Sequence, residues 1–266
     1  MNPDKLNIAI IQAQLAWGDK KSNIDYFSRE LSKLSGNIDL IVLPEMFATG
    51  FVTDVLDHTE SMEGSVISWM KDKAASINAV ITGSVAIEED DSIYNRLIWM
   101  RPDGTFEQYD KRHLFRMGNE HLKFSQGSNS PVFELKGWKI KPLVCYDLRF
   151  PVWSKNRLVN DQYQYDILVY VANWPASRCF AWNTLLAARA IENQSYCIGV
   201  NRIGEDGKGI PHRGGSVILD FKGKLIKACE DNKAETVTAT IDYKSLLHFR
   251  ETFRVALDWD QFTITP

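Results

Sequence analysis

The stretch KPLVCYDLRFP, residues 141–151, joins an apolar run to an abrupt polar turn. The apolar run is typical of a buried strand, and Cys145 stands where that strand ends. A strand-to-turn elbow projects a nucleophile outward and offers the next backbone N–H, that of Tyr146, as a hydrogen-bond donor. Because free cysteines are often core residues, the segment supports a nucleophile and a structural cysteine about equally. Pairing of Asp147 with Arg149 would fix the elbow.

Outward from this stretch, strand and helix patterns alternate to both ends of the chain. Apolar runs predict strands at 6–13, 39–43, 79–86, 92–100, 105–109, 132–135, 138–145, 166–172, 195–201, 215–219 and 236–241. Helical spacing of apolar residues predicts helices at 20–34, 65–77 and 180–193. No linker or repeat divides the chain, so we expect one α/β domain over 1–266 with a core of about 6–241. The aromatic stretch 249–266 lacks clear periodicity and is expected to be a C-terminal tail.

Composition excludes several classes of function. The 266 residues carry a net charge of -3 and no basic run interleaved with aromatic residues, so we expect no nucleic-acid partner. No apolar stretch is long enough for a bilayer, and the N-terminus does not resemble a signal peptide, which favours a cytoplasmic protein without a membrane partner. The four cysteines form no CxxC pair, and no phosphate-binding loop occurs, so we expect no metal and no cofactor.

Two further polar residues follow apolar strands. Glu45 lies in LPEMF (43–47), where the neighbouring apolar side chains would desolvate a carboxylate and make it a better base. Lys111 lies in YDKRHLF (109–115), and its ammonium group is suited to stabilise a developing oxyanion. Taken one at a time, each segment is better explained as a solvated surface loop.

Together, the three segments resemble a known family. Glu45, Lys111 and Cys145, in this order, are similar to the Glu-Lys-Cys triad of the nitrilase (carbon-nitrogen hydrolase) superfamily. The resemblance runs from about 6 to 241 and includes GNEHLKFSQG (118–127), VANWPASR (171–178), AARAIENQSYCIGVNRIG (187–204) and GGSVILDFKG (214–223). FRMGNEH and CYDLRFPVWSKNR most resemble the bacterial ω-amidases of the YafV type. Many relatives have glutamate after RFP; here Val152 takes that position, as in the YafV-like group.

The resemblance implies a fold and an activity. The fold is a four-layer-forming α-β-β-α sandwich, whose protomers pair through helices into a homodimer or a larger homo-oligomer. The activity is hydrolysis of a small-molecule amide C–N bond through a Cys145 thioester, with release of ammonia from an α-keto dicarboxylate monoamide such as α-ketoglutaramate. Glu45 is the expected base, and Lys111 and the Tyr146 N–H are the expected oxyanion donors. Glu120 aligns with a fourth polar residue that orients Lys111 or the substrate amide.

Four further residues are candidates for the substrate site. Arg149 is the candidate for holding the substrate carboxylate, although an ion pair with Asp147 is the competing interpretation. Phe47, Met117 and Trp174 are candidate pocket walls. For Met117 and Trp174, packing in the core explains the sequence at least as well.

Other classes of function stay open at this point. A Cys-His hydrolase would use His113, His121 or His212 as its base. Within the superfamily, another small amide or a nitrile is an alternative substrate. A non-catalytic binding protein on the same scaffold is expected to have lost a triad residue, and this chain retains all three.

Overall fold

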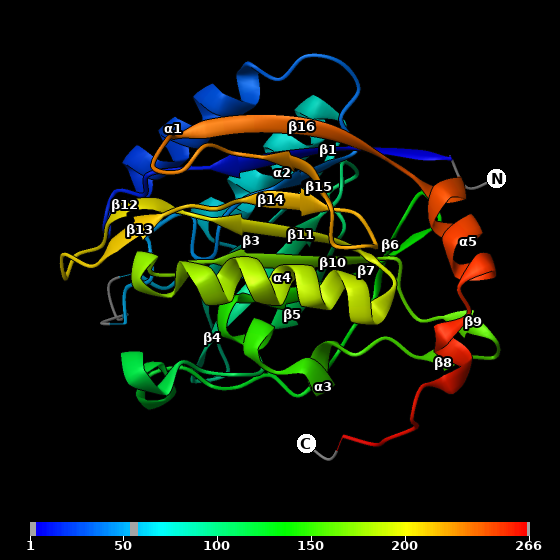
Figure 1. Cartoon of the computed structure of the whole chain (residues 1–266). Coiled ribbons are helices and arrows are strands. Elements are labelled where there is room, and N and C mark those ends of the chain that lie inside the picture. Colours follow the sequence, from blue (N-terminus) through cyan, green and yellow to red (C-terminus); the bar gives the residue numbers. More distant parts are fainter. Residues whose placement is uncertain (1–3, 54–57, 265–266) are drawn as a thin grey trace.

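The computed structural model describes residues 4–53 and 58–264, and two six-stranded sheets form its framework. The first sheet has the order β16 (Glu235–Asp242), β1 (Lys5–Gln12), β2 (Leu40–Val42), β3 (Val80–Glu89), β4 (Ser92–Met100) and β5 (Phe106–Asp110). The second has the order β15 (Leu225–Ala228), β14 (Val217–Leu219), β11 (Tyr196–Asn201), β10 (Ile167–Ala172), β7 (Trp138–Val144) and β6 (Phe133–Leu135). Figure 1 shows the strands of both sheets crossing the middle of the molecule.

Each sheet has a parallel centre and antiparallel edges. Strands β1, β2 and β3 are parallel in the first sheet, and β7, β10 and β11 are parallel in the second. Parallel strands are covered on both faces, which explains why their sequences are continuous apolar runs. Because their carboxyl ends share one edge of each sheet, the loops that follow them meet at one end of the molecule.

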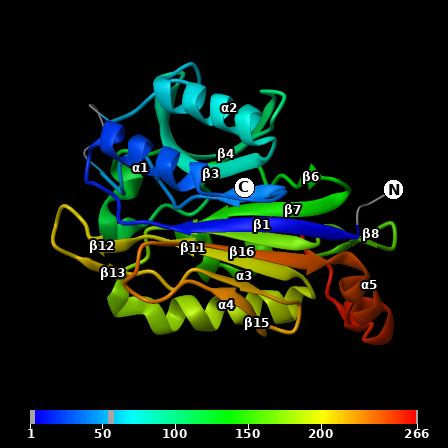
Figure 2. The ribbon, with the colours of Figure 1, turned by 90° about the horizontal axis from the view of Figure 1, so that it is seen from above.

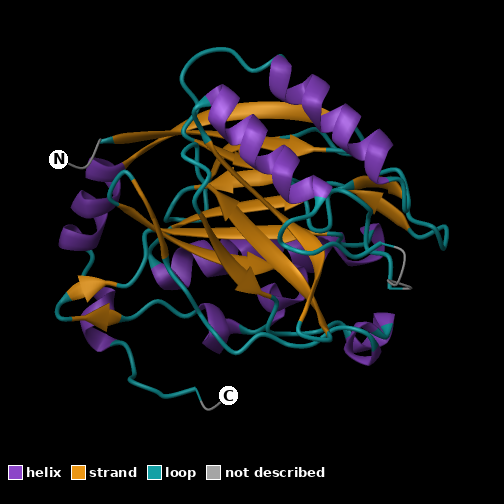
Figure 3. Cartoon of the chain, turned by 180° about the vertical axis from the view of Figure 1, so that it is seen from behind, coloured by secondary structure: helices purple, strands orange, loops and turns teal. Residues whose placement is uncertain are grey.

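Helices cover the two outer faces of the sheet pair. Figure 2 shows α1 (Lys20–Ser32) and α2 (Ser65–Ile77) on one side and α4 (Cys179–Asn193) on the other. From behind, the first two helices lie diagonally across their sheet (Figure 3). The short α3 (Pro151–Ser154) follows β7, and α5 (Tyr243–Thr252) follows β16. The predicted α-β-β-α sandwich is therefore confirmed.

Strand β1 shows how one strand contributes apolar side chains both to the core between the two sheets and to the core between a sheet and its helices. Ile8 and Ile10 belong to the cluster that includes the strands of the second sheet. Ala9 and Ile11 belong to the cluster that includes Phe27 of α1. Successive side chains of a strand point to opposite faces, so one apolar strand contributes to two layers of core.

The predicted strands and helices occur in the predicted order, and the differences are elements that were not predicted, namely helices α3 and α5 and several short strands. Strands β8 (Leu158–Val159), β9 (Gln162–Tyr163), β12 (Ile203–Glu205), β13 (Pro211–Arg213) and β15 were not predicted, because they are too short for a periodic pattern. The stretch 249–266 is not wholly an irregular tail, since its first residues complete helix α5. There the Phe249 ring stacks on Phe221 with ring centroids 4.8 Å apart.

Within the described residues, no helix combines the length and the apolar character that a membrane span requires.

A buried ion pair attaches α5 to the second sheet, and its loss is the first testable prediction. Arg250 Nη1 lies 2.6 Å from Asp166 Oδ1, and both side chains are only 4% exposed. Arg250→Met leaves the Asp166 carboxylate buried without its cation, so we expect a loss of about 3–5 kcal/mol of unfolding free energy. Denaturant unfolding of the purified protein measures this.

The matched control is Lys244→Met on the same helix, because the Lys244–Asp4 pair is exposed. We expect unfolding of the control to match that of the unchanged protein. Equal stability of the Arg250 and Lys244 variants would show that the buried pair does not hold α5 in place.

Candidate active site

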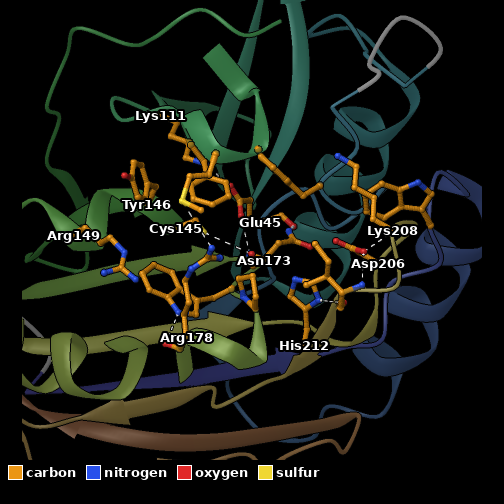
Figure 4. Close-up of a pocket in the computed structure, with 18 residues that line it drawn as sticks. Glu45, Lys111, Cys145, Tyr146, Arg149, Asn173, Arg178, Asp206, Lys208 and His212 are labelled. Carbon is orange, nitrogen blue, oxygen red and sulfur yellow. Dashed lines mark hydrogen bonds and ion pairs between the residues drawn. The ribbon is translucent and has the colours of Figure 1, made fainter. Parts of the chain in front are cut away.

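Strands of both sheets end at one cavity of about 240 Å³. Glu45 lies shortly after β2, Lys111 directly after β5, Cys145 directly after β7 and Asn173 directly after β10. All four line the cavity, and Figure 4 shows them converging at its floor. The topology thus brings together side chains that are up to 128 residues apart, the separation of Glu45 and Asn173.

Cys145 sits on a sharp elbow. Its φ of +44° lies in the left-handed region, which costs a non-glycine residue about 1–3 kcal/mol and persists only where the surroundings enforce it. Cys145 also begins a 3-10 helix that runs to Arg149. The first N–H groups of such a helix have no acceptor within it, so the Tyr146 N–H is left for another partner.

Asp147 enforces the elbow, but not through Arg149. Its Oδ2 accepts hydrogen bonds from the Val144 N–H at 3.0 Å and from the Tyr109 hydroxyl at 2.7 Å. Its Oδ1 accepts the His113 N–H at 3.0 Å. The backbone and a buried phenol thus occupy the Asp147 carboxylate, and the pair with Arg149 that the sequence left open does not form.

Lys111 is held between two carboxylates. Its Nζ lies 2.9 Å from Glu45 Oε1 and 3.0 Å from both oxygens of Glu120. The side chains of all three residues are at most 1% exposed. A buried ammonium group in this position is fixed in place, because the interior offers it no other anion of equal strength.

Asparagine side chains complete the shell around Glu45. Asn95 Nδ2 donates to Glu45 Oε1 at 2.8 Å and to Glu120 Oε1 at 3.2 Å. The Asn173 N–H donates to Glu45 Oε2 at 2.7 Å, and Asn173 Nδ2 donates to the Glu45 carbonyl at 2.6 Å. Neither asparagine was predicted as a site residue. Only the position of Asn173 at the end of an apolar strand, within the quoted stretch 171–178, signals its role.

The electrostatics of the site keep the thiol neutral. Burial and then the charge of Glu45 raise the pKa of the Cys145 thiol well above its usual range, and Lys111 opposes them only in part. For Lys111, burial favours a lower pKa, but Glu120 and Glu45 outweigh it, so the pKa of the ammonium group is raised. Burial likewise raises the pKa of Glu120 against the opposing charge of Lys111. At neutral pH the resting site therefore holds a neutral Cys145 thiol and a charged Lys111.

The predicted pocket walls divide into residues that line the cavity and one that does not. Trp174 lines it, held by its backbone N–H to Asn201 Oδ1 at 2.8 Å. Met117 lines the rim and is 78% exposed, so it is not a core residue. Phe47 is fully buried in the cluster beneath α1 and α2 and does not line the cavity. The prediction for Phe47 is wrong, because its strand-end loop turns that ring toward the helices, whereas Phe51 lines the cavity.

Arg149 lies at the cavity with its guanidinium carbon 4.9 Å from the centre of the Trp174 ring. No carboxylate lies within ion-pair distance of Arg149 or of Arg178 in the part of the chain that the structure describes. Arg178 and Lys208 line the same cavity (Figure 4). Asp206 lines the cavity as well, so three cations face one carboxylate there and positive charge prevails.

The candidate histidine bases are placed differently from Glu45. His113 stacks on Phe150 with centroids 3.7 Å apart and contacts Asp147 Oδ1 at 2.7 Å. Neither His113 nor His121 lines the cavity. His212 does line it, with Nδ1 2.9 Å from the Ile210 carbonyl, and burial lowers its pKa. The acidic partner of the thiol is Glu45, which favours a Cys-Glu arrangement over a Cys-His dyad.

No group of three or more His, Cys, Asp or Glu side chains among the described residues is arranged to hold a metal ion.

Comparisons with known proteins give consistent results. Residues 7–251 match the family model of carbon-nitrogen hydrolases. The chain is 44% identical to the ω-amidase YafV of Escherichia coli (strain K12), over 97% of this chain and 98% of that protein. It is 33% identical to the 2-oxoglutaramate amidase of Bacillus subtilis (strain 168), over 94% and 96%. The crystal structure of XC1258 from Xanthomonas campestris, a CN-hydrolase superfamily protein with an arsenic adduct in its active site, superposes with a TM-score of 0.96 at 42% identity, covering 98% of this chain and 99% of that one.

The raised pKa of the thiol gives a prediction about pH. The thiolate of Cys145 should form only above the usual range for cysteine, and Glu45→Gln should lower its pKa by removing a neighbouring negative charge. The ultraviolet absorbance of the thiolate, followed against pH and corrected with Cys145→Ala, measures both values. A thiolate already formed at neutral pH in the unchanged protein would refute this description of the site.

Proposed function

The chain belongs to the carbon-nitrogen hydrolase family and is an amide hydrolase, and from this premise we propose that it acts as an ω-amidase. Its substrate would be an α-keto dicarboxylate monoamide such as α-ketoglutaramate, and its products the keto diacid and ammonia. The 44% identity to an ω-amidase and the 33% identity to a 2-oxoglutaramate amidase, both over nearly the full chain, support this choice.

The observation that carries the proposal is the hydrogen bond of the Cys145 thiol to Glu45, whose carboxyl group also binds Lys111, at a cavity lined by further cations. A nucleophile, a base and a cation are the groups that amide hydrolysis requires. The further cations at this cavity suit a substrate whose far end is a carboxylate.

In the proposed reaction, charge moves between groups that are already in contact. Glu45 accepts the thiol proton as the Cys145 sulfur attacks the amide carbonyl. The negative charge that leaves Glu45 reappears on the tetrahedral oxyanion, where Lys111 and the Tyr146 N–H stabilise it. The net charge of the buried site stays constant, which avoids the cost of creating a new charge in a low dielectric.

The second half of the reaction returns the site to its starting state. Glu45 gives its proton to the departing ammonia, and a Cys145 thioester remains. The same carboxylate then takes a proton from water, which attacks the thioester and forms a second oxyanion. When this oxyanion collapses, the carbon–sulfur bond breaks, the keto diacid leaves, and Glu45 returns the proton to the Cys145 sulfur. In this scheme Glu120 positions Lys111, because it binds the ammonium group with both oxygens.

Arg149 is the proposed anchor of the distal carboxylate. It lines the cavity four residues beyond the nucleophile, stacks on Trp174 and has no competing carboxylate among the described residues. Trp174 and Met117 also line the cavity and are the proposed walls of the substrate site.

We also propose that the protein is a cytoplasmic homodimer or larger homo-oligomer that pairs through α4. Phe180 and Ile191 are 80% and 55% exposed on this helix. They are about three turns apart and so lie on one face. Two large exposed apolar side chains on one helix face are typical of a protein interface. A reducing compartment would keep the Cys145 thiol free for catalysis.

The proposed roles of Cys145 and Glu45 predict distinct losses of activity. Cys145→Ala should abolish ammonia release, whereas alanine at Cys179, Cys197 or Cys229 should leave it intact. Glu45→Gln should reduce kcat by about 10²–10⁴-fold, which is typical of a lost general base. Ammonia release from α-ketoglutaramate, α-ketosuccinamate, glutamine and asparagine is the assay. Near-normal activity of either Cys145→Ala or Glu45→Gln would rule out the scheme, and a preference for glutamine would rule out the substrate.

The role of Arg149 predicts a change in specificity. Arg149→Ala should lower kcat/KM for α-ketoglutaramate about 10- to 150-fold more than for a neutral amide of similar size, as expected for a hydrogen bond to a charged group. A ratio of the two kcat/KM values that does not change would remove Arg149 from the substrate site.

The proposed interface predicts a change in assembly. Phe180→Glu should shift the protein toward a smaller species in sedimentation experiments, because a charge replaces an apolar contact. Leu257→Glu, at a residue 67% exposed on a different surface, is the matched control. A monomeric unchanged protein would contradict the proposal directly.

A further inference from the structure

A second cavity, of about 230 Å³, lies apart from the active site. The two cavities share no lining residue. The second is bounded by β7, by α3 and the residues after it, and by Thr263 and Ile264. The polar side chains that line it include three cations, hydroxyl groups and an amide, but no carboxylate: Lys141, Lys155, Arg157, Ser128, Ser130 and Gln164.

Lys141 is the unusual member of this set. It lies on β7, four residues before Cys145, and only 4% of it is exposed. Its Nζ donates to Ser130 Oγ at 2.8 Å and lies 6.0 and 5.8 Å from the ring centres of Trp153 and Tyr165. In residues 4–53 and 58–264, no carboxylate is within ion-pair distance of it. A buried ammonium group is normally paired, because removing it from water is costly.

The neighbouring cations increase this cost. Burial and then the charge of Arg157 lower the pKa of Lys141 to about 8, against the opposing charge of Asp147. The Arg157 guanidinium carbon lies 4.3 Å from the centre of the Phe262 ring, and no described carboxylate pairs with it. Lys155 Nζ donates to the Glu192 carbonyl at 2.8 Å and adds a third positive charge at the wall. Positive charge therefore accumulates around the cavity, and no carboxylate of the described residues forms an ion pair with any of the three cations.

We infer that this second cavity is a binding site for a small dianion, either a phosphoryl group or a dicarboxylate. Lys141 would supply the buried charge at its base, Arg157 a forked donor at its wall, and Ser128, Ser130 and Gln164 neutral hydrogen bonds. Two negative charges on one ligand offset three cations better than chloride or a monocarboxylate does. The Arg157 fork matches the oxygens of a phosphate or a carboxylate. The site is independent of the activity proposed above.

Thermal unfolding of the full chain tests this inference. Melting temperatures are compared in chloride, acetate, succinate and inorganic phosphate at equal ionic strength and neutral pH. We expect succinate or phosphate to raise the melting temperature above its value in chloride, and acetate to leave it unchanged. A rise in phosphate alone identifies a phosphoryl site, and a rise in succinate alone identifies a dicarboxylate site. The absence of a rise with either dianion would overturn the inference.

Substitutions separate this site from other anion sites. Lys141→Met keeps most of the side-chain volume, removes the buried charge and should abolish the rise. Lys139→Met changes a residue on the same strand and face that lines a different cavity, so this variant should still show the rise in melting temperature. Because a dicarboxylate also fits the proposed substrate site, Arg149→Ala is a second control, and it should show the rise as well. A rise of equal size in Lys141→Met and the unchanged protein would show that the dianion binds elsewhere.

A second variant keeps the test valid if Lys141→Met fails to fold. Arg157→Gln, at the cavity wall, should weaken dianion binding by about tenfold or more, measured by calorimetric titration with whichever dianion raised the melting temperature. Unchanged affinity in this variant would exclude Arg157 and the cavity as the binding site.

Discussion

The active site depends on one ammonium group shared by two carboxylates in the protein interior. Lys111 lies 2.9 Å from Glu45 and 3.0 Å from Glu120, and no other cation contacts either carboxylate in the described part of the chain. If Lys111 were absent, two buried negative charges would face each other without compensation, at a cost of several kcal/mol. Its presence lets a carboxylate stand beside the Cys145 thiol deep in the cavity. In the proposed reaction, the same lysine is available, without rearrangement, to stabilise the charge that moves from Glu45 to the substrate.

The fold places these groups by ending strands of both sheets at the same end of the molecule. Glu45 and Lys111 come from the first sheet, and Cys145 and Asn173 come from the second. Met46 and Cys145 both adopt a positive φ, +43° and +44°, so the backbone turns sharply at both positions, just after a strand ends. Asp147 holds one of these turns through the Val144 N–H, while the Ser84 hydroxyl accepts the Met46 N–H at 2.9 Å in the other. The strain is sustained because the two sheets are packed against each other over a continuous apolar core.

The sequence was sufficient to predict the main strands, their order and the residues at their ends, and the resemblance to the family implied the layers of the fold. Continuous apolar runs identify buried strands, and the motifs around Glu45, Lys111 and Cys145 identify the family. The partners of those residues were harder to predict. Asn95 is part of a strand with no distinguishing pattern. A pair between Asp147 and Arg149 was considered because the two residues are close in sequence, but this proximity does not show which way each side chain turns. The prediction for Phe47 was wrong for the same reason. Phe47 faces the helices, whereas Phe51, four residues further along the same loop, lines the cavity.

The second cavity was not predicted, because its cations are separated along the chain and come together only in the folded structure.

The central claim is that Cys145, deprotonated by Glu45, carries the acyl group of the substrate as a thioester. Acid-quenched mass spectrometry of the protein during turnover of α-ketoglutaramate, followed by peptide mapping, tests it most directly. We expect a transient adduct, equal in mass to the substrate less ammonia, on the peptide that contains Cys145. An adduct on another residue, or complete turnover of one equivalent of substrate with that peptide unmodified at every quench time, would contradict it.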